Sequence, residues 1–235
     1  MSYVIQKDLT NTNSPEGRAV LQAALLRDDK VRIVGYHQLD GLDNDSRHSI
    51  PVGSVKYVEA FARHFGITMP SPIDYPSELN PFLHRKIHRI LFSEAIIGDF
   101  IKPTKTKSFD TIRCFAAEEH GIDPMEVCWT SEPVNFMDEY RVYVLRGNVI
   151  GVCRYDSEPS IRDISLYFDN ETKRMIKAYT RQPIAWALDV GFTANGNLLL
   201  VEVNDAWATG YYHEGLTPGA YTNWLTARWE EILEG

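Results

Sequence analysis

The chain has 235 residues, of which 44% are hydrophobic and 24% charged, and its formal net charge is −8. This length allows one large domain or two small ones, and the composition is that of an ordinary soluble globular protein. The acidic charge argues against broad electrostatic binding to nucleic acid, and no apolar run approaches the roughly 20 residues of a membrane span. Three scattered cysteines and an N-terminus without a signal pattern favour the cytoplasm.

Residues 1–75 predict a small α/β domain with short strands and two helices. The first helix should begin at Ser14, because serine is a good N-cap and the proline after it suits the first helical position. The second helix should end at Gly66. Four prolines between residues 69 and 81 make that stretch the best candidate for a domain boundary.

The next part of the chain carries a candidate phosphate-binding lysine. A helix is expected over residues 82–97, and its basic side is more typical of a solvated face than of a phosphate patch. A short strand over residues 99–103 carries Lys102, and Lys107 lies in the loop that follows. The remaining elements expected here are a helix over residues 112–120 and a strand over residues 127–135.

Residues 185–210 predict a β-hairpin. Apolar runs flank Asn195-Gly196, a dipeptide typical of a two-residue type I′ turn. With the turn at this dipeptide, Asp189 pairs with Glu202 across the hairpin. Asn204 shares a face with Glu202, because side chains alternate along a strand.

The expected pair of carboxylates needs compensation. Side chains placed opposite each other have Cβ atoms roughly 4.5–5.5 Å apart, so two carboxylates there repel. Mg²⁺ would compensate, because it takes one or two carboxylates together with substrate phosphates. A protonated carboxyl, or exposure of both groups to bulk water, would also relieve the repulsion, and the hairpin pattern leaves these alternatives open.

A second hairpin is expected around Gly147-Asn148. This placement pairs Arg141 with Arg154 and puts Glu139 on the same face as Arg141. Two facing arginines repel unless an anion or the neighbouring acids intervene, so an anion site and a surface network of ion pairs are both compatible with the pattern. A C-terminal helix is expected over residues 219–233.

These elements together resemble the ATP-grasp enzymes, such as D-alanine–D-alanine ligase and glutathione synthetase. The resemblance rests on the metal-binding strands with their E-x-N pair, the F-I-K-P strand and the hinge-like stretch SEPVNFMDEYRVYV, and it runs from about Asn80 to the C-terminus. The run VEVNDAWATGYY also resembles short ATP-grasp proteins often carried by phages. The implied fold class is α/β, with subdomains at residues 76–135 and 136–235 gripping ATP after a lead-in domain at residues 1–75.

The resemblance implies roles for the metal and phosphate ligands. Asp189, Glu202 and Asn204 would hold one or two Mg²⁺ ions. Lys102 and Lys107 would contact the ATP phosphates. The loop that carries Lys107 lacks the glycines common in the family, which puts its grip on the phosphates in doubt.

The resemblance also implies a nucleoside site and a pair of catalytic arginines. The adenine would bind the backbone of the hinge-like stretch Glu132, Pro133, Val134 and Asn135. Glu139 would bind the ribose hydroxyls. Ala187 stands where D-alanine–D-alanine ligases place an arginine, so Arg141 or Arg154 would have to stabilise the oxyanion.

The chemistry implied by the resemblance is ligation of a carboxylate to an amine, through an acyl phosphate formed from ATP. The substrate would be an amino acid, a peptide or a protein terminus. A kinase on the same scaffold and an ATP-binding interaction module without turnover are the alternatives. The glycine-poor loop and Ala187 favour the module, whereas the complete Asp/Glu/Asn set favours an enzyme.

Overall fold

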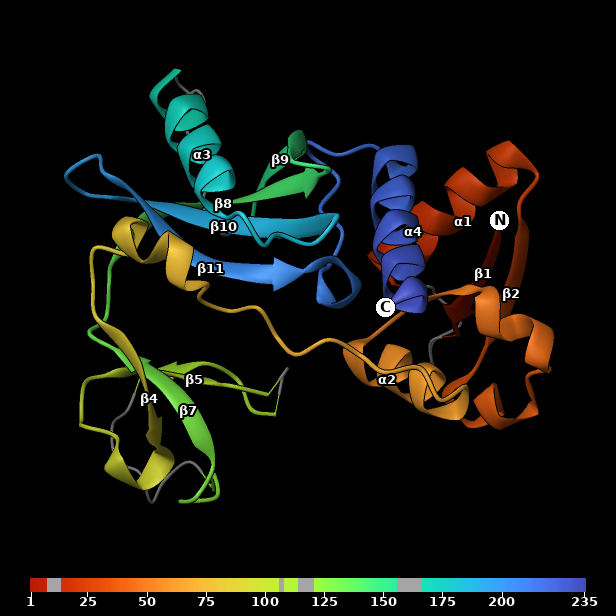
Figure 1. Cartoon of the computed structure of the whole chain (residues 1–235), viewed down its shortest axis with the longest axis horizontal. Coiled ribbons are helices and arrows are strands. Elements are labelled where there is room, and N and C mark those ends of the chain that lie inside the picture. Colours follow the sequence, from red (N-terminus) through yellow and green to blue (C-terminus); the bar gives the residue numbers. More distant parts are fainter. Residues whose placement is uncertain (8–13, 106–107, 114–120, 156–165) are drawn as a thin grey trace.

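The computed structural model describes residues 1–7, 14–105, 108–113, 121–155 and 166–235. Lys107 and most of the helix expected over residues 112–120 lie outside these ranges. The described chain forms three sheets with helices packed against them (Figure 1). This mixed α/β architecture confirms the predicted fold class.

The N-terminal part is a three-stranded parallel sheet with the strand order β2-β1-β3. Its elements are β1 (Ser2–Gln6), α1 (Pro15–Arg27), β2 (Lys30–Val34), β3 (Ile50–Val52) and α2 (Val55–His64). Ser14 caps α1 by accepting a hydrogen bond from the Gly17 amide, as its sequence predicts. Gly66 has a φ of 63° directly after α2, which explains why a glycine ends this helix.

A large antiparallel sheet with the strand order β11-β10-β8-β9 forms the centre of the molecule. Its strands are β8 (Phe136–Leu145), β9 (Asn148–Arg154), β10 (Ala185–Thr193) and β11 (Leu198–Asp205). Helix α3 (Leu166–Ala178), which we did not predict, covers one face (Figure 1). Phe168 and Met175 of α3 pack there against Trp186 and Leu188. The opposite face remains for the polar residues described below.

A smaller antiparallel sheet has the strand order β4-β7-β5-β6. Its strands are β4 (Ile87–Leu91), β5 (Phe100–Pro103), β6 (Ile112–Arg113) and β7 (Val127–Ser131). The helix predicted over residues 82–97 is therefore wrong. His84 has a φ of 49°, and the Arg85 guanidinium donates to the Leu200 and Val201 carbonyls, so tertiary contacts override the helical spacing here.

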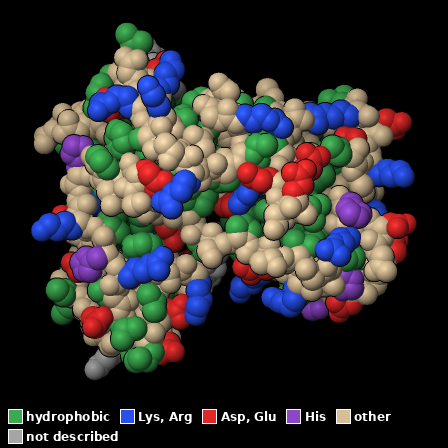
Figure 2. Space-filling view, viewed as in Figure 1, with side chains coloured by type: hydrophobic (Ala, Val, Ile, Leu, Met, Phe, Trp, Pro, Cys, Tyr) green, Lys and Arg blue, Asp and Glu red, His purple; other side chains and the backbone are tan. Residues whose placement is uncertain are grey.

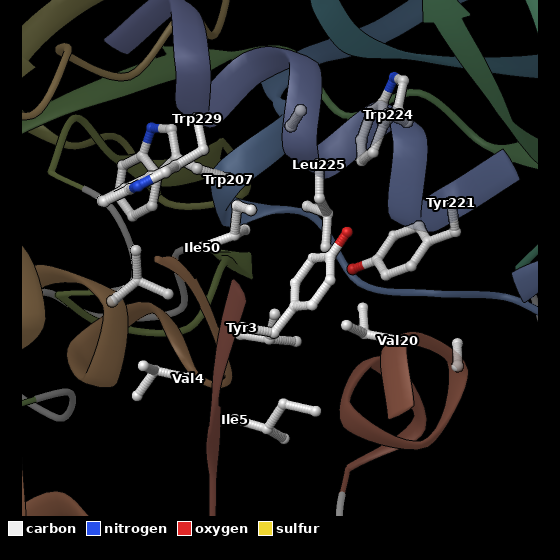
Figure 3. Close-up of a cluster of buried hydrophobic side chains, with 14 of the residues drawn as sticks. Tyr3, Val4, Ile5, Val20, Ile50, Trp207, Tyr221, Trp224, Leu225 and Trp229 are labelled. Atoms are coloured by element: carbon white, nitrogen blue, oxygen red, sulfur yellow. The ribbon is translucent and has the colours of Figure 1, made fainter. Parts of the chain in front are cut away.

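The C-terminal helix α4 (Pro218–Glu234) confirms the predicted element and joins the two larger sheets. Trp224 donates a 2.8 Å hydrogen bond to the Val144 carbonyl of the large sheet. On its other side, Tyr221 and Trp229 belong to the buried cluster that contains Tyr3 of β1 (Figure 3). Helix α4 thus completes the core of the N-terminal sheet from the far end of the chain.

Both predicted hairpins form, but with different turns. In the hairpin of β10 and β11, only Gly196 has a positive φ, and Thr193 bonds Asn197 around a three-residue loop. A register shift beyond Asp189 then restores the predicted pairing of Asp189 with Glu202. The expected two-residue turn is wrong, whereas the pairing that the site depends on is confirmed.

The hairpin of β8 and β9 turns one residue earlier than predicted. Arg146 and Gly147 both have positive φ, as a type I′ turn requires. A further register shift follows between Tyr143 and Val144, so Arg154 pairs with Tyr140 and not with Arg141. The predicted pairing of two arginines is therefore wrong.

The surface shows neither a membrane span nor a single-sign patch on the side in view. No helix among the described residues combines the length and apolar character needed to cross a membrane. Figure 2 shows Lys and Arg side chains scattered among acidic ones on this face. This distribution agrees with the expectation that the protein does not bind nucleic acid broadly.

Candidate functional site

A row of charged side chains crosses the open face of the large sheet. Arg141, Asp189 and Glu202 lie side by side on β8, β10 and β11, because Asp189 is the register partner of both other residues. The Arg141 guanidinium donates two hydrogen bonds to the Asp189 carboxylate, of 2.8 and 2.6 Å. Asp189 is only 1% exposed, so this bidentate pair is an interior one.

Asn204 links the two carboxylates of the row. Its Nδ2 donates to Asp189 Oδ2 at 2.9 Å and to Glu202 Oε1 at 2.8 Å. Both carboxylates therefore point at one position between β10 and β11. The predicted metal ligands are brought together by the fold, as the hairpin register requires.

Lys102 extends the row from the small sheet. Its Nζ lies 2.5 Å from Glu202 Oε2 and 2.5 Å from Asp74 Oδ1. The second oxygen of Asp74 accepts a 2.9 Å hydrogen bond from Trp129 Nε1. Lys102 is thus held between carboxylates from the large sheet and from the linker that precedes the small sheet.

A cavity of about 230 Å³ opens beside this junction. Its walls include Asp74, Lys102, Glu202 and Asn204, together with the β5–β6 loop. Three carboxylates and two cations line the row, which leaves one net negative charge at the mouth of the cavity. A cation brought in with a polyanion would balance this arrangement.

Burial and pairing act on the ionisable groups in opposite directions. Burial raises the pKa of the Asp189 carboxyl, although the Arg141 guanidinium opposes this shift. Burial also acts to raise the pKa of Glu202, but the Lys102 ammonium outweighs it and holds that pKa below its usual range. The pKa of Lys102 is raised, because two carboxylates overcome its desolvation. Both cations are therefore charged at any physiological pH.

Glu139 and Arg141 share the open face of β8, as predicted. The Tyr155 hydroxyl donates a 2.6 Å hydrogen bond to Glu139 Oε2. The rings of Tyr155 and Tyr212 lie 5.3 and 5.4 Å from the Arg141 guanidinium carbon and flank it. The two rings leave Arg141 little rotational freedom, so its guanidinium is fixed before any ligand arrives.

The loop that carries Tyr212 approaches β9 at a glycine. A Cβ atom at Gly215 would lie 1.9 Å from the Val152 carbonyl oxygen, so no other residue fits there without a shift of the backbone. The Tyr212 amide also donates to the Tyr143 hydroxyl at 3.3 Å. These contacts fix the aromatic wall beside Arg141.

The other predicted ligands are placed as follows. Residues 132–135 form the extended connection between β7 and β8, which joins the two antiparallel sheets. Lys107 lies outside the described residues. Arg154 pairs with Asp138 at 3.0 Å, and both follow the side-chain alternation of Tyr140, on the face that α3 covers. The structure therefore does not bring Arg154 to Arg141, and we do not propose a catalytic role for it.

Several residues of this site were not predicted. Asp74 lies in the proline-rich stretch that we interpreted only as a boundary, and Trp129 and Tyr155 carry no motif. Arg89 was assigned to a solvated helix face, but it stacks on Trp129, with 4.5 Å from its guanidinium carbon to the ring centre. The alternation of apolar and basic residues over 87–91 is the one signal that could have indicated this strand.

The donor set at Asp189, Glu202 and Asn204 fits Mg²⁺. Two carboxylates and an amide are the hard oxygen ligands that this ion accepts, and the carboxylates already converge. No group of three or more His, Cys, Asp or Glu in the described ranges forms a ligand cluster. The fit therefore depends on phosphate oxygens for the remaining positions, as is usual for Mg²⁺.

Comparisons with known proteins agree with this geometry. Residues 82–224, more than half of the chain, match a family described as an ATP-grasp domain, the second family of its clade. A search of curated protein sequences finds no match.

Solved structures with the same fold include the ATP-grasp ligase PsnB complexed with a minimal precursor, at 16% identity and a TM-score of 0.55, covering 97% of this chain and 99% of that one. The D-alanine–D-alanine ligase of Bacillus anthracis has 10% identity and a TM-score of 0.61, with coverages of 99% and 97%. The N5-carboxyaminoimidazole synthetase of Staphylococcus aureus has 11% identity and a TM-score of 0.59, with coverages of 97% and 77%. At these identities the likeness concerns the fold.

Proposed function

Since this chain belongs to the ATP-grasp domain family that matches residues 82–224, we propose that it is a ligase that uses Mg-ATP to join a carboxylate to an amine. The observation that carries the proposal is the convergence of Asp189, Glu202 and Asn204 beside Lys102 and Arg141. An interaction module without turnover would need no such alternation of cations and cation ligands in one row.

The nucleotide would lie between the small and the large sheet. Lys102 would contact its phosphates, the 132–135 connection its adenine, and Glu139 its ribose hydroxyls. Asp189, Glu202 and Asn204 would hold Mg²⁺, which neutralises phosphate charge and helps to stabilise the transferring phosphoryl group. Lys107 stays a predicted phosphate ligand.

In the first step, a substrate carboxylate oxygen forms a bond to the γ-phosphorus, and the bond from that phosphorus to the β,γ-bridging oxygen breaks. ADP leaves with the electron pair, and an acyl phosphate is formed. In the second step, the amine nitrogen bonds the acyl carbon, phosphate departs, and the nitrogen loses a proton to solvent. Arg141 would stabilise the charge that develops on the phosphoryl or acyl oxygens, because its guanidinium is fixed in advance.

An amino acid, a peptide or a protein terminus is the proposed substrate. A structure of PsnB, an ATP-grasp ligase of the same fold, contains a minimal precursor, which supports a peptide. A kinase on the same scaffold would share the first step and transfer the phosphoryl group to its final acceptor.

The test is nucleotide consumption by the full chain with Mg-ATP and pooled amino acids or peptides, with ADP, AMP and phosphate resolved. Release of ADP and phosphate together with a new amide product is the expected result. ADP with a stable phosphorylated product would favour the kinase. AMP, or no turnover with tight ATP binding, would overturn the ligase.

A further inference from the structure

Asp74 lies in the linker between α2 and the small sheet, where the linker passes beside β11 (Figure 1). The Asp74 carbonyl accepts a 2.8 Å hydrogen bond from the Val203 amide, which forms an isolated bridge at the edge of the large sheet. Its φ of 52° is uncommon for a residue other than glycine, and it is 6% exposed. The backbone is thus fixed at the position from which the side chain enters the cavity.

Both carboxylate oxygens of Asp74 have a partner in the cleft. Oδ1 binds Lys102 Nζ, and Oδ2 accepts from Trp129 Nε1. The Tyr75 ring lies 5.3 Å from Lys102 Nζ and packs edge-on against Trp129, with 5.1 Å between ring centres. If Asp74 withdrew, the Trp129 donor and the Lys102 charge would each lose a partner in a partly buried site, which is costly.

We propose that Asp74 is a positioning residue for the phosphate site, which anchors Lys102 when Glu202 is drawn to a cation. An ammonium group has three donors, and Asp74 and Glu202 occupy two of them. A Mg²⁺ ion bound by Glu202 competes with Lys102 for that carboxylate. Asp74 is not one of the proposed metal ligands, so it keeps Lys102 in the cleft and leaves the remaining donors for phosphate.

This inference rests on the proposed nucleotide site, and it differs from the opposite possibility that Asp74 occupies Lys102 in place of phosphate. The two have opposite signs. An anchor strengthens phosphate binding, whereas a competitor weakens it. The fixed backbone and the two partners of the carboxylate favour the anchor, because a competitor has to leave when the ligand arrives.

The test variant is Asp74→Asn, because asparagine tolerates the left-handed conformation and keeps the side-chain shape while removing the charge. We would titrate Mg-ADP and adenosine into the full chain by calorimetry. About ten- to hundredfold weaker binding of ADP is expected, with unchanged binding of adenosine, since one charge-assisted contact to Lys102 is lost. A purely structural role would weaken both ligands.

The matched control is Asp110→Asn, which removes the same charge from an exposed side chain on the wall of the same cavity. It should leave both affinities near the wild-type values. A second control repeats Asp74→Asn on a Lys102→Met background, where it should add no further loss of ADP affinity because its target is gone.

Equal or tighter ADP binding by Asp74→Asn would overturn the inference and leave the nucleotide site intact. A full additional loss on the Lys102→Met background would also overturn it. Failure of the wild-type chain to bind Mg-ADP would overturn the proposed function together with this inference. If Asp74→Asn does not fold, as judged by thermal melting, Trp129→Phe frees one carboxylate oxygen without a change in charge and should weaken ADP binding in the same direction.

Discussion

Arg141 and Asp189 form a two-point ion pair inside the large sheet, with bonds of 2.8 and 2.6 Å. Each group compensates the charge of the other in a place where water cannot. Removing one partner of such a pair leaves a buried charge and typically costs about 3–5 kcal/mol of stability. Binding and catalysis at this position therefore have to be measured together with stability.

Arg141→Lys is expected to retain the fold better than Arg141→Ala, because the charge opposite Asp189 is kept while the planar fork is lost. If Arg141 stabilises charge that develops only in the transition state, Arg141→Ala should lower kcat by roughly 10²–10³-fold and change the KM for ATP much less. Arg141→Lys should recover part of kcat. Steady-state kinetics on variants shown to be folded by calorimetry would check this, and near-normal kcat in both would refute the assignment.

Glu202→Gln should abolish most of the Mg²⁺ dependence of nucleotide binding. The change keeps the side-chain shape but removes one of the two converging carboxylates, and Lys102 retains Asp74 as its partner. We expect a loss of roughly 1 kcal/mol or less in the free energy of unfolding, since a repelling pair is relieved at the same time. Calorimetric titration with and without Mg²⁺ tests the metal role, with Glu171→Gln of an exposed ion pair as the control. Unchanged affinity at saturating Mg²⁺ would count against it.

Lys102→Met should affect phosphates and not the nucleoside. ATP binding should weaken most, ADP binding less, and adenosine binding hardly at all, because only the phosphates reach the cavity beside Lys102. The comparison of three ligands separates a phosphate contact from a general loss of structure. Equal losses for all three would show that Lys102 is a structural residue.

Stability in acid should depend in part on Glu78. Hydrogen bonds from Arg181, of 2.7 and 3.1 Å, lower the pKa of Glu78 from 4.5 to about 2. The unfolded chain therefore binds a proton at a higher pH than the folded one, so the stabilising contribution is complete above 4.5 and disappears as the pH falls towards 2. Chemical unfolding of wild type and Glu78→Gln should give a difference that shrinks over this interval. A difference independent of pH would contradict the pairing.

The hairpins show what the sequence can specify. Asn195-Gly196 marks a turn correctly, but the loop has three residues, and a bulge beyond Asp189 restores the predicted pairing with Glu202. In the other hairpin the bulge adds to the error in the turn, and the predicted partner of Arg141 moves to the opposite face. A β-bulge depends on packing against neighbouring strands, and a local pattern does not contain that information.

Long-range partners explain the remaining differences. The spacing of apolar residues over 82–97 fits a helix, yet β4 forms because β7 offers a ladder and the β11 carbonyls bind Arg85. Asp74 reaches Lys102 only because the linker returns to the edge of the large sheet. The residues with family-like spacing were found from the sequence, whereas those that hold them in place were not.

The position of α4 has a consequence for synthesis of the protein. The core around Tyr3 of β1, made early on the ribosome, is completed by Tyr221 and Trp229, which are made near the end. The N-terminal sheet then cannot bury its apolar face while the rest of the chain is still being translated. We expect the nascent N-terminal segment to stay sensitive to protease until α4 has left the exit tunnel, so that folding of the first and last segments is one late, cooperative event.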